Sequence, residues 1–166
     1  MNYKTLKNDY ANFNQNYKKY LKLGFKYWLI GLGIMAFSNV IIANITGGLA
    51  SNETSVRESL FEYPVYMILS TNILAPFVEE LTFRGNFKEA FQKDYQYIIF
   101  TSLLFSGVHV LNGISSPLEL LYFIPYGALA TSFGLTYVKT NNIYTTMVLH
   151  AFHNTLSIIL MVLTTL

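Results

Sequence analysis

Cysteine is absent from this chain of 166 residues, and charged residues are scarce. Without cysteine, disulfides, thiolate metal ligands and thiol nucleophiles are excluded. The aspartates are Asp9 and Asp94, both outside the apolar stretches, so a mechanism based on paired aspartates within a membrane lacks its residues. Charged residues make up 12% of the chain and hydrophobic residues 52%, a composition that departs from that of soluble domains.

The hydrophobic residues fall into long blocks instead of the short runs of a soluble core. At a rise of about 1.5 Å per residue, such blocks are long enough for a hydrocarbon core of roughly 30 Å. We therefore predict an all-α membrane protein with about five transmembrane helices, over residues 27–51, 63–78, 95–111, 120–138 and 143–166. The second block is short, and its helix would continue to residue 87 if the charges there face other helices.

The first 26 residues carry many lysines, yet they do not form a secretory signal, because the basic region and the apolar block after it are too long and no cleavage pattern follows. Apolar side chains recur there every three or four residues, which predicts an amphipathic interfacial helix on the cytoplasmic membrane surface. The stripe could instead pack against the protein's own helices or a partner. Its members are Tyr3, Leu6, Tyr10, Phe13, Tyr17 and Tyr20. We predict a cytoplasmic segment, 1–26, followed by a transmembrane catalytic domain, 27–166.

The distribution of charge predicts an orientation. With a cytoplasmic N-terminus, ten of the eleven basic residues lie on the cytoplasmic side, as the positive-inside rule requires. Arg57 lies on the far side, together with Glu53, Glu58, Glu62 and Glu119. We expect a multi-pass protein of the cell (plasma) membrane.

Ionisable groups inside apolar spans indicate function, because they are costly to place there. The first group contains Glu79, Glu80 and Arg84. Glu80 and Arg84 are four residues apart, so they can pair on one helix face, while Glu79 points about 100° away and is free to act as a base. Taken alone, the group is also typical of a charged helix at a membrane edge.

The other two groups contain histidine. Phe105 precedes His109 by one helical turn and can pack against its ring. His150 and Asn154 share a helix face, where they could stabilise an oxyanion or join helices by hydrogen bonds. We interpret His153 as an interhelical packing residue.

These three patterns, in this order and on separate predicted spans, resemble the CAAX-protease and bacteriocin-processing family, also called Abi or type II CAAX prenyl endopeptidases. That family shows Glu-Glu-x-x-x-Arg, then Phe-x-x-x-His, then His-x-x-x-Asn. The chain has Glu79-Glu80-x-x-x-Arg84, Phe105-x-x-x-His109 and His150-x-x-x-Asn154. The resemblance covers residues 63–166.

The resemblance implies a role for each motif residue. Glu79 and His109 would activate the attacking water, and His150 and Asn154 would bind the carbonyl oxygen of the tetrahedral intermediate. The supporting residues would be Glu80, Arg84 and Phe105.

Metal dependence has two readings. Glu79, His109 and His150 could form the two-histidine, one-glutamate ligand set of a catalytic zinc site, and the family is often described as metalloproteases. A metal-free glutamate mechanism uses the same residues, and we favour it, with zinc as the alternative.

Other protease chemistries fit less well. The chain has no His-Glu-x-x-His and no Gly-x-Ser-x-Gly motif, although composition leaves a serine and histidine dyad open.

Straight antiparallel helices would separate Glu79 from His109 by roughly 20 Å along the helix axis. Shared water activation therefore requires tilted or displaced helices that bring both side chains within about 8 Å, in a cavity that we expect to open toward the cytoplasm.

We therefore expect an intramembrane endopeptidase whose partners are the lipid bilayer and a peptide or membrane-protein substrate, with no nucleic acid. The alternative is a non-catalytic membrane immunity or regulatory protein that gives bacteriocin self-immunity by binding a partner.

Overall fold

The computed structural model describes residues 1–164 and contains helices but no β-strand over that range. The predicted all-α class is confirmed. The α-helices are α1 (Tyr3–Thr46), α2 (Ser51–Glu62), α3 (Pro64–Leu69), α4 (Ala75–Glu80), α5 (Asp94–Leu111), α6 (Phe123–Thr140) and α7 (Ile143–Leu163). Shorter elements are the π-helical turns η1 (Ser70–Leu74) and η2 (Leu81–Gly85) and the 3-10 turns η3 (Lys88–Ala90) and η4 (Pro117–Tyr122).

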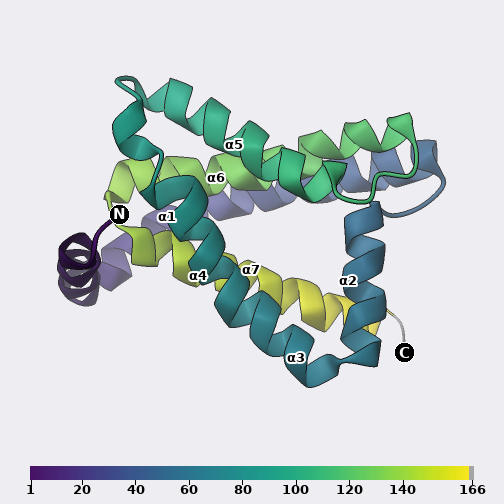
Figure 1. Cartoon of the computed structure of the whole chain (residues 1–166), viewed down its shortest axis with the longest axis horizontal. Coiled ribbons are helices and arrows are strands. Elements are labelled where there is room, and N and C mark those ends of the chain that lie inside the picture. Colours follow the sequence, from purple (N-terminus) through teal and green to yellow (C-terminus); the bar gives the residue numbers. More distant parts are fainter. Residues whose placement is uncertain (165–166) are drawn as a thin grey trace.

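The helices form two arms that meet near the N-terminus and spread apart toward the other end of the molecule (Figure 1). One arm contains α1, α5 and α6, with α6 packed against both of the others. The second arm contains α7 and the run from α3 to α4, which pack against each other. Helix α2 crosses between the spread ends of the two arms (Figure 1).

Tight turns set this arrangement. Helix α1 ends at Gly47, whose φ of 80° is a conformation that glycine adopts without steric cost. Between α6 and α7, Asn141 takes a left-handed conformation and the Asn142 side chain accepts a hydrogen bond from the Thr145 amide. The Asn-Asn pair thus ends one helix and caps the next, which turns the chain back at the junction of the two arms.

Many large apolar side chains lie on the outside of the molecule, and several polar side chains lie inside it. Phe37, Val65 and Leu103 are 71%, 72% and 59% exposed, whereas Glu80 and Arg84 are completely buried. Water would favour the reverse distribution, while a hydrocarbon solvent favours this one. The surface therefore supports a position within a bilayer.

Three helical stretches are long and apolar enough to cross a membrane among the residues that the structure describes. They are Tyr3–Thr46, Pro117–Thr140 and Ile143–Leu163, which correspond to the first, fourth and fifth predicted spans. The second and third predicted spans are helical but do not meet the same criterion of length and composition, α3 to η2 being interrupted by π-turns. The number of five spans stays a prediction.

The N-terminal segment continues without interruption into the first apolar block, so α1 is a single helix of 44 residues. Within the apolar stripe, Leu6 packs against a buried cluster of the protein and Phe13 against Tyr144, whereas Tyr3 is 79% exposed. Part of the stripe therefore serves the protein's own packing. Its contact with the membrane surface and the boundary at residue 26 stay predictions.

Candidate active site

The site begins with a distortion that Pro76 introduces before Glu79. In η1 the amide of Ala75 donates to the Ser70 carbonyl, five residues back. The next bond in that register would run from residue 76 to Thr71, but proline has no amide hydrogen. The free Thr71 carbonyl instead accepts a hydrogen bond of 2.7 Å from Nδ2 of Asn154 on α7. The π-turn and this contact fix how α4 lies against α7.

Glu79 projects from α4 toward two histidines on different helices. Its Oε2 lies 3.9 Å from Nε2 of His109 on α5 and 3.8 Å from Nε2 of His150 on α7. No hydrogen-bond partner for this oxygen occurs among the described residues. The structure therefore meets the condition that the side chains of Glu79 and His109 approach within about 8 Å.

Both histidine rings are held through their other nitrogen. Nδ1 of His109 donates to the Phe105 carbonyl at 2.9 Å, and the Phe105 ring stacks on the imidazole with centroids 4.2 Å apart. Nδ1 of His150 donates to Oε1 of Glu80 at 2.8 Å. With Nδ1 acting as the donor, a neutral His109 ring keeps its lone pair on Nε2, the nitrogen that faces Glu79.

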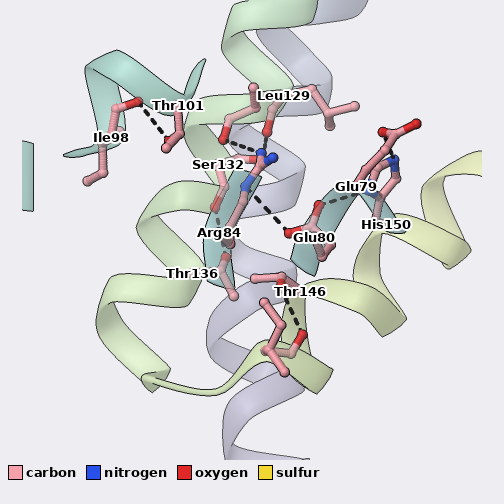
Figure 2. Close-up of polar contacts among 12 residues, drawn as sticks. Glu79, Glu80, Arg84, Ile98, Thr101, Leu129, Ser132, Thr136, Thr146 and His150 are labelled. Atoms are coloured by element: carbon pink, nitrogen blue, oxygen red, sulfur yellow. Dashed lines mark hydrogen bonds and ion pairs between the residues drawn. The ribbon is translucent and has the colours of Figure 1, made fainter. Parts of the chain in front are cut away.

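Glu80 and Arg84 form the ion pair expected from their spacing, with Nε of Arg84 3.4 Å from Oε2 of Glu80. Both side chains are fully buried, and Arg84 also donates to the Ala130 carbonyl on α6 at 3.1 Å. Figure 2 shows Arg84 reaching toward α6 on one side and toward Glu80 on the other, with His150 beyond Glu80. The adjacent glutamates thus differ: Glu80 is tied to Arg84 and His150, and Glu79 faces the cavity.

All four residues predicted to be catalytic line one cavity of about 440 Å³. They are Glu79, His109, His150 and Asn154. His153 also reaches the cavity wall, but its Nδ1 accepts a hydrogen bond of 3.4 Å from Trp28 on α1, as an interhelical packing residue would. Asn52, Glu53 and Arg57 of α2 also line the cavity, and α2 lies at the end of the molecule opposite the N-terminus. The side toward which the cavity opens stays a prediction.

The donor types at Glu79, His109 and His150 suit zinc, but their spacing does not. Two ligands of a tetrahedral zinc ion lie about 3.4 Å apart, less than both nitrogen-to-oxygen distances at Glu79. Among the described residues, no group of three or more His, Cys, Asp or Glu side chains is arranged to hold a metal ion. We therefore derive no step through a metal.

Sequence reasoning missed two parts of the site. Thr71 and Pro76 carry no titratable group, and only the proline within an apolar span signalled a distortion. The polar residues of α2 that line the cavity, Asn52, Glu53 and Arg57, lie between the first two predicted spans and were not connected with the site from the sequence.

The chain belongs to the Rce1-like family, because a sequence model of the family, described as "Type II CAAX prenyl endopeptidase Rce1-like", matches residues 61–156, more than half of the chain. The predicted resemblance is confirmed, and the family is one of membrane proteases. The apolar helices agree with a multi-pass membrane protein.

One relative is the UPF0177 protein YvdC of Lactococcus lactis subsp. lactis (strain IL1403), which is 24% identical over 151 residues. The match covers 84% of this chain and 56% of the relative, so the chain spans little more than half of that protein's length. No solved structure matches the chain.

Proposed function

We propose that this chain is an intramembrane endopeptidase in which Glu79 and His109 activate a water molecule for attack on a peptide bond. The observation that carries the proposal is the approach of Glu79 Oε2 to two Nε2 atoms, one from α5 and one from α7, at the wall of one cavity. Family membership supports the reaction class. The geometry supports the assignment of roles.

The distance between Glu79 and His109 suits a bridging water. Oxygen and nitrogen atoms 3.9 Å apart can both lie about 2.8 Å from one water molecule, whose two contacts then make an angle near 90°. Glu79 takes a proton from this water as the oxygen attacks the carbonyl carbon, and His109 Nε2 accepts the second hydrogen bond. The proton then passes from Glu79 to the leaving nitrogen as the carbon–nitrogen bond breaks.

His150 and Asn154 are the proposed donors to the oxyanion of the tetrahedral intermediate. His150 donates through Nδ1 to Glu80, so donation from Nε2 as well requires a proton on each ring nitrogen. Asn154 has two amide hydrogens, of which the Thr71 carbonyl uses one, leaving the other for the substrate.

The experiment compares membranes from cells that make the wild-type chain, Glu79→Gln or Glu58→Gln. Glu58 is an exposed glutamate on α2, so its substitution is the same chemical change away from the proposed reaction centre. Mass spectrometry of protein termini should find new termini with the wild type and Glu58→Gln, and none with Glu79→Gln. Identical sets of termini in all three samples would refute the proposal and favour a non-catalytic immunity protein.

A further inference from the structure

Helix α2 forms part of the cavity wall. Asn52, Glu53 and Arg57 line it there, and Ser157 and Ile158 of the second half of α7 line the adjacent wall. In Figure 1, α2 crosses between the spread ends of the two arms, farthest from their junction. The proposed reaction centre thus shares one cavity with polar residues of α2, the helix that crosses between the arms.

The opposite end is closed by buried side chains. Glu80, Arg84 and Phe133 are completely buried and lie directly behind His150, which stacks on Phe133 with centroids 4.9 Å apart. Tyr97 and Thr146 are also completely buried. This layer separates the cavity from the junction of the arms.

The N-terminus adds a second layer at the closed end. The Met1 amino group donates to Oδ1 of Asn86 at 2.7 Å, and Asp9 accepts from the first amide of α7, that of Ile143, at 3.2 Å. Asn142 donates to the Asp9 carbonyl at 2.7 Å. The start of α1 is therefore tied both to the segment after η2 and to the α6–α7 turn.

The two ends carry opposite charge. The closed end holds the lysines of the N-terminal segment and of the segments near η3 and the end of α6, including Lys88, Lys93 and Lys139. The α2 end holds several glutamates and one arginine, namely Glu53, Glu58, Glu62, Glu119 and Arg57. Under the positive-inside rule, the closed end faces the cytoplasm and the α2 end faces the outside.

We propose that the cavity takes its substrate from the extracytoplasmic side, past α2. This inference rests on the proposed protease function and names its substrate class: exported peptides, or extracytoplasmic segments of membrane proteins next to a span. The cavity volume falls within the roughly 300–1,000 Å³ of small-ligand sites, so it accommodates a short stretch of a peptide. Apolar walls that include Met35, Leu129 and Ile158 favour apolar residues beside the cleaved bond.

Contacts of α2 with the first arm hold it across the entrance. The Ser51 amide donates to Oε2 of Glu119 on η4 at 3.2 Å, and Asn52 donates to the Tyr126 hydroxyl on α6 at 3.1 Å. Leu60 is buried in a cluster with Ile158 and Met161 of α7. Helix α2 therefore contacts both arms, and a substrate must pass beside it.

The absence of cysteine allows a direct test, because one introduced cysteine is the only thiol. Ser157→Cys reports on the cavity, Glu58→Cys on the α2 end and Lys93→Cys on the closed end; Glu58 and Lys93 are both exposed. Intact cells are treated with a membrane-impermeant maleimide, before or after permeabilisation. We expect Glu58→Cys and Ser157→Cys to react in intact cells, and Lys93→Cys to react only after permeabilisation.

Three results would overturn the inference: reaction of Lys93→Cys in intact cells, reaction of Ser157→Cys only after permeabilisation, or no reaction of Ser157→Cys in either condition. Thr146→Cys, at a completely buried position, sets the background. Labelling does not require catalysis, so the same pattern is expected in a Glu79→Gln background. A chain that labels as expected but cuts nothing would refute the protease function and leave the orientation of the cavity intact.

Discussion

Arg84 has a stabilising role that a second ion pair in the chain does not share. Arg84–Glu80 is fully buried, whereas Arg57–Glu53, also four residues apart, has side chains 27% and 25% exposed. Removing one partner of a buried pair costs about 3–5 kcal/mol because the other charge is left without compensation. An exposed pair contributes about 0–1 kcal/mol.

We therefore predict that Arg84→Met lowers the free energy of unfolding by about 3–5 kcal/mol, and that adding Glu80→Gln recovers part of this loss. Arg57→Met is the matched control and should cost about 1 kcal/mol or less. Denaturant unfolding in detergent micelles measures all four proteins. Equal losses for Arg84→Met and Arg57→Met would contradict the role given to the buried pair.

A metal chelator tests the chemistry at Glu79, His109 and His150. In the structure these three side chains are too far apart to be ligands of one zinc ion, and the proposed water activation uses only side chains. We expect peptide cleavage by purified protein in proteoliposomes to continue at the same rate after chelation and dialysis. Loss of cleavage that zinc restores would contradict the metal-free mechanism.

At the residue scale, much of the site could be predicted from the sequence. Buried charge is expensive in an apolar span, so Glu79, His109 and His150 signalled function by their type alone. The hydrogen-bond partner of Asn154 could not be predicted, because it is a backbone carbonyl that is free only after Pro76 shifts the helix register. The pattern of side chains in a sequence does not show which backbone carbonyls are free to accept a hydrogen bond.

The π-turn before α4 is the element whose geometry differs most from the straight helices assumed from sequence. Thr71 has a free carbonyl because Pro76 lacks an amide hydrogen, and Asn154 satisfies that carbonyl. Loss of a hydrogen bond to a buried acceptor costs about 1–3 kcal/mol, and the contact of Asn154 with Thr71 is partly buried. The loss of stability when Asn154 is removed should therefore depend on whether residue 76 is a proline.

We predict that Asn154→Ala destabilises the wild-type chain by about 1–3 kcal/mol, and by clearly less in a Pro76→Ala background, because alanine restores an amide donor and the helical register. Thermal unfolding in detergent measures the four proteins of this double-mutant cycle. Asn154→Ala losses of equal size in the two backgrounds would show that Thr71 and Pro76 are not linked through Asn154.

The assumption of straight helices also gave a wrong position for His109 along the membrane normal relative to Glu79. Counting residues along the predicted spans separated Glu79 from His109 by roughly 20 Å. In the structure the side chains of Glu79 and His109 approach each other because the two arms are inclined to each other (Figure 1). In addition, π-turns interrupt the helix that carries Glu79. Crossing angles depend on side-chain packing between helices, which hydropathy does not encode.

For the molecule as a whole, the exposed apolar side chains are the main evidence that the protein lies in a bilayer. In a water-soluble protein, a substitution at the exposed Leu103 of α5 would change stability by no more than about 0.5 kcal/mol. At the centre of a membrane-spanning helix, arginine costs about 2.5–3.5 kcal/mol or more.

We predict that Leu103→Arg strongly reduces the amount of chain that resists alkaline extraction from membranes. Tyr3→Arg, at an exposed position in the lysine-rich segment, is the control and should have little effect. Equal membrane integration of the two variants would argue that Leu103 does not face lipid.

The central claim is hydrolysis by water that Glu79 and His109 activate, and its most direct test is cleavage in water enriched in oxygen-18. Wild type, Glu79→Gln, His109→Ala and the controls Glu58→Gln and His153→Gln are reconstituted with the membrane proteins of the expressing host. We predict new carboxyl termini containing one oxygen-18 atom with the wild type and both controls. Glu79→Gln and His109→Ala should form them on the order of 100- to 10,000-fold more slowly. Labelled termini formed at the wild-type rate by folded Glu79→Gln and His109→Ala would contradict the account.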